Sequence, residues 1–546
     1  MALLMAERIA EGLKRKSLTT CSRWAESCRV MGRPYPGPWS FRHHPWLREM
    51  HDSDAELNVG QKAAQMGFTE TILNIVFFAI DVKGIDCLYV LPAKTPDASD
   101  FSAARFDPAL EMSPHLANMF SDVKNVGHKR AGTTNLYIRG SRSRASLKSV
   151  PTGLIVIDEV DEMTQANIPL AMERASGQVE KMTWMVSTAT IHNFGINKFF
   201  LGSSQNHFQF KCPLCGRFTE LTFPESLVVL GEDHNDPAVK GSHLVCKECK
   251  GQLRHETKPD WLATGRWESS FTDRDSAGWY VNQMYSCTVS PVEMAKSYLL
   301  AQSDPAAEQE FHNSKMGVPH EVKGARVTDQ DLENCKRGYK REDARGGGFV
   351  TLGVDVGKFL HYEVDEWFLP AANYGGPDIN VSAHCKVLTH GKIKDFEELD
   401  GLMRLFGVAF CVIDANPERR KATEFANRFY GRVKLCFYGR GVQGKTIHVS
   451  EAEPTLTVDR TSWLDLSLSR FRQRDAITLP LDVDLEYRNH MKALVRVYET
   501  DPDGNPVGRY VKGNDEDHYA HARNYAEIAL PMGMALGQSE SLGSVL

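Results

Sequence analysis

The 546-residue sequence lacks any run of about 18 uncharged apolar residues. A helix needs roughly 20 such residues to cross a bilayer, so no membrane-spanning segment is expected. The N-terminal segment, residues 1–26, is charged and mildly amphipathic, without the continuous apolar stretch that a signal peptide carries. The sequence therefore predicts neither secretion by that route nor a membrane protein.

An excess of positive charge is also missing. The 64 Lys and Arg residues stand against 70 Asp and Glu residues, which gives a formal net charge of −6. Any contact with nucleic acid must therefore use local basic patches, such as the loop over residues 124–148. Twelve cysteines in so long a chain do not resemble a small secreted disulfide framework, and four of them have metal-ligand spacing. These features favour a reducing cytoplasm, and the length predicts two or three domains.

Residues 153–162, Gly-Leu-Ile-Val-Ile-Asp-Glu-Val-Asp-Glu, are the centre of the first predicted domain. Four branched apolar residues in a row are typical of a strand buried on both faces of a parallel sheet. Asp158 and Glu159 follow at its carboxyl end, where open α/β sheets bind ligands. In a nucleotide hydrolase, Asp158 would hold Mg²⁺ and Glu159 would orient or deprotonate the attacking water. The alternative is a buried strand that ends in a solvated acidic turn.

Residues 57–71 predict a strand, a loop and the start of a helix. A phosphate-binding loop has parts that are present here, namely Gly67, Lys62 and a hydroxyl from Thr69 or Thr71 near the helix start. Their order departs from G-x-x-x-x-G-K-[ST], because Phe68 stands where the lysine should be and Lys62 stands at the beginning of the loop. The alternative is a glycine-containing turn between a strand and a helix.

Two further segments are candidates for nucleotide contact. Trp46 ends a stretch rich in proline and aromatic residues, and its ring would stack on an adenine base or, alternatively, pack against the sheet. The apolar strand that begins at Met182 ends in the hydroxyls of Ser187 and Thr188. In sheet-based ATPases such a strand end can sense the γ-phosphate.

Four cysteines give the most specific local signal. Cys212 and Cys215 form one C-x-x-C pair, and Cys246 and Cys249 form another. Two such pairs separated by a β-rich insert can present four thiolates tetrahedrally, as in a zinc ribbon. We expect structural zinc, with iron or a redox-active dithiol as the alternative.

After a charged stretch that ends in Gly346–Gly348, the chain again places carboxylates after apolar strands. Asp355 follows one such strand and Asp414 another, and Asp517 lies at the start of a helix near the end of the chain. Together these aspartates could hold two Mg²⁺ or Mn²⁺ ions that clamp the attacking water and the leaving 3′ oxygen of a phosphodiester. His518 is an alternative third ligand, and each aspartate alone could be a cap or turn residue.

In this order the motifs resemble the large terminase subunit of tailed bacteriophages, in its lambda-like, gpA-type branch. The resemblance implies an α/β fold in which a P-loop (RecA/ASCE-like) ATPase domain with a zinc-ribbon insert precedes an RNase H-like nuclease domain. The expected parts are an N-terminal helix and aromatic arm (1–50), the ATPase domain (51–330, with the ribbon at about 207–254), a linker (331–348) and the nuclease domain (349–546).

The resemblance also implies an activity. The protein would be an ATP-driven motor that packages viral DNA into the procapsid and an endonuclease that cuts concatemers. Lys62 and Thr69 would contact the phosphates and Mg²⁺, residues 187–190 would couple hydrolysis to movement, and Asp355, Asp414 and Asp517 would hold the nuclease metals. Two residues depart from the family pattern, since Ala189 replaces a frequent proline and His521 a frequent second aspartate.

The implied partners are double-stranded viral DNA, the small terminase subunit, the portal protein and further copies of the chain in a ring, all in the host cytoplasm. Two other functions fit the same motifs. One is a helicase-like, DNA-stimulated ATPase whose RNase H-like domain binds DNA without cutting it. The other is a zinc-stabilised adaptor without catalysis.

Overall fold

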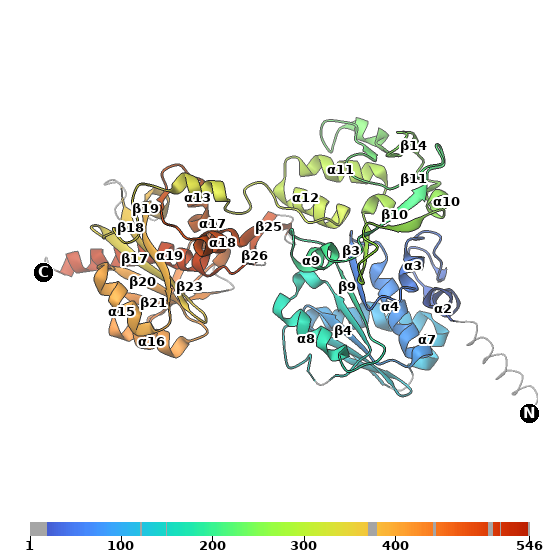
Figure 1. Cartoon of the computed structure of the whole chain (residues 1–546), viewed down its shortest axis with the longest axis horizontal. Helices are drawn as coiled ribbons and strands as arrows, with labels where there is room; N and C mark the ends of the chain where they lie inside the picture. Colours follow the sequence, from blue (N-terminus) through green and yellow to red (C-terminus); the bar gives the residue numbers. More distant parts are fainter. Residues whose placement is uncertain are drawn as a thin grey trace, which may run out of the picture. The chain divides into compact units, whose positions relative to one another are not determined.

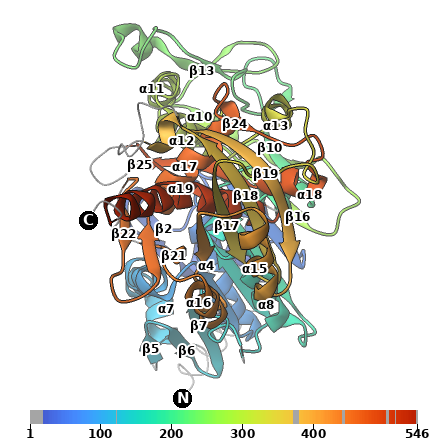
Figure 2. The same ribbon diagram turned by 90° about the vertical axis from the view of Figure 1, so that its left-hand side faces the viewer.

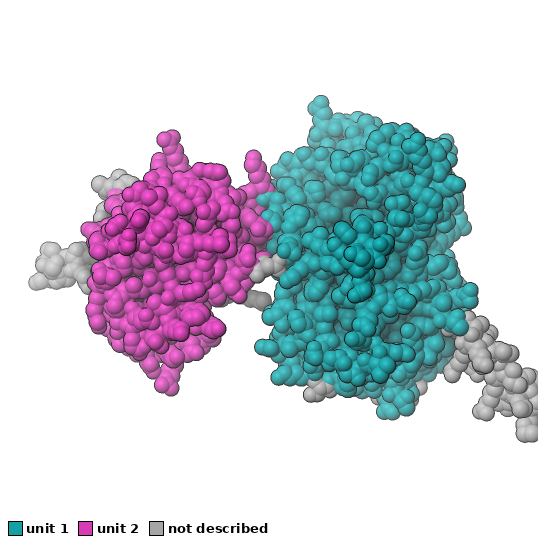
Figure 3. Space-filling model, in the orientation of Figure 1, with its two compact units in different colours: residues 1–322 teal, residues 323–546 magenta. Residues whose placement is uncertain are grey.

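The computed structural model describes residues 19–120, 123–148, 150–369, 379–439, 444–500, 506–513 and 515–543. The chain divides into two compact units, Met1–Val322 and Lys323–Leu546, which Figure 3 colours separately. The first part of the helix expected over residues 1–26 lies outside the described residues, and helix α2 (Cys21–Cys28) follows it. Among the described helices, none is long and apolar enough to cross a membrane.

The first unit is built on a mixed sheet of 11 strands (Figure 1). Its parallel centre contains, in spatial order, β16 (Ala277–Val281), β3 (Leu57–Lys62), β9 (Met182–Ser187), β8 (Leu154–Asp158), β4 (Cys87–Leu91) and β7 (Thr134–Gly140). The flanking strands are β10 (Asn206–Lys211), β11 (Phe218–Thr219), β15 (Arg266–Ser269), β6 (His128–Ala131) and β5 (Val123–Asn125). Strand β9 thus lies between the predicted phosphate-loop strand and the predicted acidic strand, the order expected of an ASCE-type ATPase.

Both faces of this sheet are covered, which explains why its central strands are apolar at every position. On one face Val156 belongs to a core shared with helix α4 (Phe68–Phe78). On the other face Ile157 packs in a core with residues of α8 (Ile168–Met172) and α9 (Gly195–Leu201). The remaining helices of the unit are α3 (Leu47–His51), α5 (Ser99–Phe101), α6 (Asp107–Met112), α7 (Pro114–Met119), α10 (Lys258–Leu262), α11 (Pro291–Ala301) and α12 (Pro305–Glu310).

The cysteine-bearing segment is an insert of short antiparallel pairs. Strands β10 and β11 pair around the first C-x-x-C, and β13 (His243–Val245) pairs with β14 (Gln252–Leu253) around the second. Strand β12 (Leu227–Val228) completes the small sheet with β13. The short strands agree with the β-rich insert expected from the sequence.

The second unit contains an eight-stranded sheet, seen from another side in Figure 2. Its spatial order is β22 (Ile447–Val449), β23 (Thr455–Val458), β21 (Val433–Tyr438), β20 (Phe410–Asp414), β17 (Phe349–Val356), β18 (Leu360–Phe368), β19 (His384–Ile393) and β24 (Ile477–Thr478). Strands β17, β18 and β19 form an antiparallel meander, whereas β17, β20 and β21 run parallel. This order and mixture of directions are those of an RNase H-like fold.

Helices lie against the sheet of the second unit, and α19 (His518–Gly543) packs on β17, β18 and β20. The others are α13 (Asp329–Cys335), α14 (Ile379–Ser382), α15 (Phe396–Leu405), α16 (Arg419–Arg428), α17 (Arg460–Ser469) and α18 (Leu485–Lys492), and a hairpin joins β25 (Leu494–Thr500) to β26 (Pro506–Lys512).

The segment 331–348 is not the free linker that its charge and glycines suggested. Leu332 and Cys335 are buried in a core of the second unit, and Ala344 is buried in another. The division between the units falls earlier, after Val322. Burial of these apolar side chains outweighs the charged composition around them.

Candidate functional sites

The candidate phosphate loop connects β3 to α4 through residues 63–67. Gly67 has φ = +82°, and a Cβ at this position would lie 2.7 Å from Leu47 Cδ1, so glycine is required here. Thr69 is the second residue of α4, where free backbone N–H groups and the helix dipole favour an anion. The strand, loop and helix were predicted correctly. Lys62, however, is the last residue of β3 and not a loop residue.

Lys62 and the acidic pair come together at the carboxyl edge of the sheet. The Lys62 Nζ atom lies 3.7 Å from Glu159 Oε1, although β9 separates their strands. Lys62 is almost fully buried, whereas the Glu159 side chain is 42% exposed. Glu159 has φ = +59°, a strained value for a residue with a side chain, and such strain is concentrated at functional sites.

The Asp158 carboxylate is oriented by a hydrogen bond from a buried tyrosine that the sequence did not predict. The Tyr89 hydroxyl donates a hydrogen bond of 2.5 Å to Asp158 Oδ2, and the Glu159 N–H donates one of 3.1 Å to Oδ1. Burial, together with the charge of Glu159, raises the pKa of Asp158 to about 6, against the opposing charge of Lys62. A bound divalent cation would favour the ionised form of this carboxylate.

The hydroxyl-rich end of β9 contacts the acidic motif through Asp161, also missed from the sequence. Ser187 Oγ accepts a hydrogen bond from the Asp161 N–H at 3.3 Å. The Asp161 carboxylate accepts one from the Thr190 N–H at 2.8 Å and one from the Ile196 N–H at 2.7 Å. Burial raises the pKa of Asp161 to about 7. The neighbouring Thr188 is half-buried.

Thr190 also contacts the end of the first unit. Its carbonyl accepts hydrogen bonds from the His320 N–H at 3.1 Å and from Asn313 Nδ2 at 3.0 Å. The segment that carries Asn313 also contacts the phosphate loop, because the Ala64 N–H donates to the Ser314 carbonyl at 2.8 Å. A continuous set of hydrogen bonds therefore joins the acidic motif to the last residues of this unit.

Trp46 does not offer a ring face for a base. Its side chain is fully buried, and its Nε1–H donates to the Met66 carbonyl at 3.1 Å. The ring makes edge contacts with Phe208 and Tyr285. Trp46 therefore has the alternative role, in which it packs an aromatic arm against the rest of the unit. Burying the large apolar indole ring is more favourable than leaving it exposed to stack on a base.

The four cysteines form one cluster. The Sγ atoms of Cys212, Cys215, Cys246 and Cys249 all lie within 4.8 Å of one another. Each pair sits in the same kind of turn, in which a later N–H donates to the carbonyl of the first cysteine. Gly216 N–H donates to the Cys212 carbonyl and Lys250 N–H to the Cys246 carbonyl, both at 2.9 Å. This donor set suits a tetrahedral thiophilic ion.

Asp355 and Asp414 meet on neighbouring parallel strands of the second unit. Val354 of β17 pairs with Ile413 of β20, so the next residue on each strand is an aspartate at the same edge. Burial raises the pKa of Asp414 to about 6, and the charge of Asp355 acts in the same direction, whereas an N–H bond from Asn416 opposes it. Two carboxylates on neighbouring strands at the same edge of a sheet are suited to bind a cation.

Asp517 contacts two basic side chains. Its carboxylate lies 3.2 Å from Lys512 Nζ and 3.3 Å from His521 Nε2. Although burial opposes it, the hydrogen bonds from His521 and Lys512 hold the pKa of Asp517 well below its ordinary range. His518 instead contacts Asp355, with 2.7 Å between Nδ1 and Oδ2. His518, one of the two candidates for a third ligand, is thus in direct contact with Asp355.

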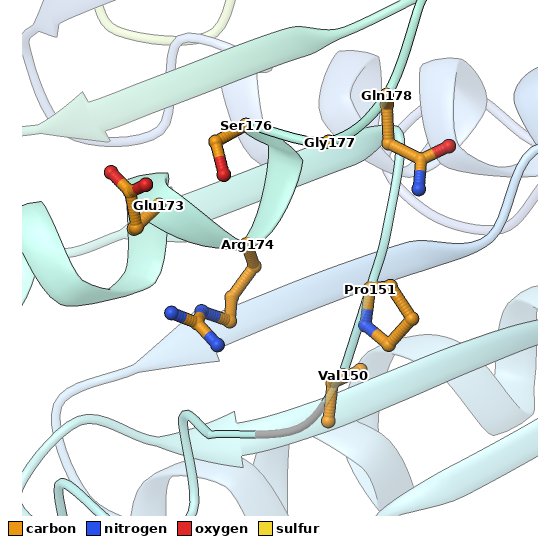
Figure 4. Close-up of a pocket in the computed structure, with 7 residues that line it drawn as sticks. All are labelled: Val150, Pro151, Glu173, Arg174, Ser176, Gly177 and Gln178. Atoms are coloured by element: carbon orange, nitrogen blue, oxygen red, sulfur yellow. The ribbon is translucent and has the colours of Figure 1, made fainter.

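A surface hollow of about 290 Å³ lies at the other end of the strands in the first unit (Figure 4). Its lining includes Val150 and Pro151, which precede β8, and Gly177 and Gln178, which precede β9. Because the candidate nucleotide residues follow the carboxyl ends of these strands, this hollow is separate from them.

Two protein-family models match the chain. The model described as the ATPase domain of the phage terminase large subunit gpA matches residues 34–267, and the endonuclease domain of the same subunit matches residues 276–367. Together they cover more than half of the sequence. No curated protein matches it.

Solved structures give weaker likenesses. A large terminase from a thermophilic bacteriophage has 11% identity and a TM-score of 0.31, over 90% of this chain and 99% of that one. The ATPase domain of the Thermus phage P74-26 large terminase has 12% identity and a TM-score of 0.32, over 51% and 96%. The large terminase nuclease from thermophilic phage G20c with bound magnesium has 15% identity and a TM-score of 0.23, over 36% and 94%.

Proposed function

This chain belongs to the gpA family of phage terminase large subunits, and on that premise we propose how its residues perform the two activities. The protein has the family's ATPase and endonuclease domains and works with DNA in packaging. We propose that the first unit hydrolyses ATP to translocate double-stranded viral DNA and that the second cuts concatemers. The observation that carries the first assignment is the approach of Lys62 to Glu159 across an intervening strand.

In the ATPase unit, Asp158 and Thr69 would hold a Mg²⁺ ion, which would neutralise charge on the nucleotide phosphates. The fit rests on a buried carboxylate already oriented by Tyr89. Lys62 neutralises phosphate charge, beside Gly67 and the N–H groups that begin α4. A polyphosphate carries more charge than one carboxylate, so it draws Lys62 from Glu159. The freed Glu159 carboxylate then orients the attacking water and accepts its proton.

The hydrogen bonds of Asp161 support a coupling role for residues 187–190. The short helix that follows Glu159 carries Asp161, whose carboxylate holds the Thr190 N–H. Any shift of Glu159 on loss of the γ-phosphate therefore moves the backbone at Thr190 and its contacts with Asn313 and His320. Ser187 and Thr188 would contact the γ-phosphate, and its loss would be transmitted through the hydrogen bonds of Asp161 to Thr190.

In the nuclease unit, Asp355 and Asp414 would hold Mg²⁺ or Mn²⁺. The metal supplies a lowered pKa for the attacking water and neutralises the departing 3′ oxygen. The two carboxylates would position the metal ion at the neighbouring ends of β17 and β20. Asp517 supports the site through His521, whose charge also lowers the pKa of Asp414.

The cysteine cluster would bind one structural Zn²⁺. Its four thiolates leave no position open for a substrate, so the ion would stabilise the insert and take no part in hydrolysis.

We further propose that the protein acts in the host cytoplasm as a homo-oligomeric ring, with the small terminase subunit and the portal protein as partners. Membership of the family supports these assignments. A ring that grips the DNA backbone needs no sequence readout, so a weakly acidic chain is compatible with translocation.

A single set of variants tests both activities. Lys62→Ala and Glu159→Gln should abolish DNA-stimulated ATP hydrolysis and leave plasmid cleavage with Mn²⁺ intact. Asp355→Asn and Asp414→Asn should abolish cleavage and leave ATP hydrolysis intact. The exposed residues Glu180 and Glu424 provide matched controls, as Glu180→Gln and Glu424→Gln.

Retained hydrolysis in both Lys62→Ala and Glu159→Gln would overturn the ATPase assignment. A wild-type protein that hydrolyses ATP but never cleaves DNA would instead favour a helicase-like ATPase with a DNA-binding second unit.

A further inference from the structure

Two histidines lie close to Asp355, near the end of strand β17 in the nuclease unit. Ligand atoms of Asp355, His361 and His518 all lie within 4.8 Å of one another. The residues come from three elements, since Asp355 and His361 are directly paired across β17 and β18, and His518 begins α19. The two imidazole rings are stacked, with 4.5 Å between centroids and 8° between planes.

His361 has a buried ring nitrogen that the protein leaves unsatisfied. The residue is only 4% exposed, and its Nδ1 atom has no hydrogen-bond partner among the described residues. A buried nitrogen without a partner costs about 1–3 kcal/mol, so native proteins rarely retain one without a reason. One ring nitrogen of His361 belongs to the cluster of ligand atoms, and a cation bound to Nδ1 would supply the missing partner.

Neighbouring rings fix His361 in place. Tyr519 meets it edge to face at 5.0 Å between centroids, and His490 lies at 5.6 Å on another side. Gly357 allows His518 to approach, because a Cβ there would lie 3.3 Å from the His518 ring. The imidazoles are therefore held by packing, as expected for preorganised metal ligands.

We propose that Asp355, His361 and His518 form a mixed carboxylate and imidazole site that binds a first-row transition metal ion, such as Mn²⁺ or Co²⁺, more tightly than Mg²⁺. Imidazole nitrogen is a poor ligand for Mg²⁺, which prefers carboxylate and water oxygens, whereas transition metals accept both donors. This inference rests on the proposed nuclease function and deepens it. Asp414, beside Asp355, remains the ligand of an oxygen-only position that Mg²⁺ can occupy.

The test is metal binding by the full-length protein without DNA. Titrations with Mn²⁺ and Mg²⁺ give the two affinities, and pulsed electron paramagnetic resonance of bound Mn²⁺ detects coupling to imidazole nitrogen. We expect nitrogen coupling in the wild type. We expect His361→Gln and His518→Gln each to weaken Mn²⁺ binding at least about tenfold, while Mg²⁺ affinity changes less than about twofold.

His448→Gln is the control, because His448 is an exposed histidine on β22, which three strands separate from β17 in the same sheet, and it is not among the three ligands. It should retain Mn²⁺ affinity and the nitrogen coupling. Absence of nitrogen coupling in the folded wild type, or unchanged Mn²⁺ affinity in both histidine variants, overturns the proposal. His518 is half-buried, so its substitution keeps the test valid if His361→Gln does not fold.

The outcomes separate this inference from the nuclease assignment. Unchanged Mn²⁺ binding in the histidine variants, with cleavage still lost in Asp414→Asn, would refute the mixed site alone. Cleavage that survives in both Asp355→Asn and Asp414→Asn would refute the nuclease assignment itself.

Discussion

Tyr89 and Asp158 are joined by a hydrogen bond of 2.5 Å between two almost fully buried side chains on neighbouring strands. The hydroxyl donates to one carboxylate oxygen, while the other accepts the N–H of Glu159. The orientation of the proposed Mg²⁺ ligand is therefore determined inside the sheet, away from the nucleotide. The bond also lowers the pKa of Asp158 against the effect of burial.

Tyr89→Phe should weaken ATP hydrolysis without unfolding the protein. A hydrogen bond to a charged group is worth about 1.5–3 kcal/mol, so we expect a loss of roughly 10- to 100-fold in kcat/KM. Part of the loss should be recovered at high Mg²⁺, because the freed carboxylate binds its proton more tightly. Steady-state ATPase assays over a range of Mg²⁺ concentrations measure both effects. Tyr137→Phe, on the adjacent strand β7, is the control, and an identical Mg²⁺ dependence in both variants would argue against this role.

Asp161 should make the first unit less stable as the pH rises from about 4 to about 7. Burial raises its pKa in the folded protein to about 7 from an ordinary value of 3.8. In that range the unfolded chain has lost the proton and the folded chain still binds it, so stability falls with pH, by up to roughly 4 kcal/mol. Below the ordinary value both states are protonated, so this carboxyl causes no loss of stability there.

Asp161→Asn cannot titrate and serves as the reference for this measurement. Between about pH 4 and 7 the unfolding free energy of the wild type should fall relative to that of Asp161→Asn. Hydrogen exchange over residues 187–196, corrected for the intrinsic rate at each pH, reports it locally, because the Thr190 and Ile196 amides bond to this carboxylate. Parallel pH profiles in the two proteins would contradict the prediction.

Arg523 should be essential for the stability of the second unit. Its fully buried guanidinium contacts Glu363 at 3.1 Å, Glu527 at 2.6 Å and also Asp365. Arg523→Leu would remove this cation from Glu363 and Asp365, while Glu527 would keep its ion pair with Arg470, and the expected cost is about 3–5 kcal/mol. Calorimetry should show a lower melting temperature for this unit. Arg420→Leu, which removes an exposed ion pair with Glu424, should change it little, and equal effects would contradict the argument.

The cysteine cluster should contain one zinc ion per chain. Cys215→Ser and Cys249→Ser alter exposed ligands, so they should remove zinc and lower the melting temperature of the insert without disturbing buried packing. Elemental analysis of the purified protein and thermal unfolding with a chelator measure these effects. Cys28→Ser, outside the cluster, should retain the metal. Zinc-free wild type, or full zinc in both ligand variants, would contradict the assignment.

The sequence was sufficient wherever the signal was local. The apolar run before Asp158 predicted β8, and the segment around Gly67 predicted a strand, a loop and a helix, because these patterns depend on residues near one another in the chain. Ordered along the chain, such motifs also identified the family. The sequence could not decide between the two roles offered for Trp46 or reveal the burial of Leu332 and Cys335, because composition does not show what an apolar side chain will be buried against.

The sequence by itself determined that the candidate residues for ATP and phosphodiester hydrolysis lie at strand ends and turns, since these features are set by local periodicity. Only the tertiary structure decided which of them meet. The parallel strand order β3-β9-β8 places Lys62 and Glu159 at the same edge of the sheet, close enough to contact each other across β9. The antiparallel register of β17 and β18 pairs His361 with Asp355. Such contacts depend on which strands pair, and pairing is decided by the burial of whole sheets rather than by any short segment.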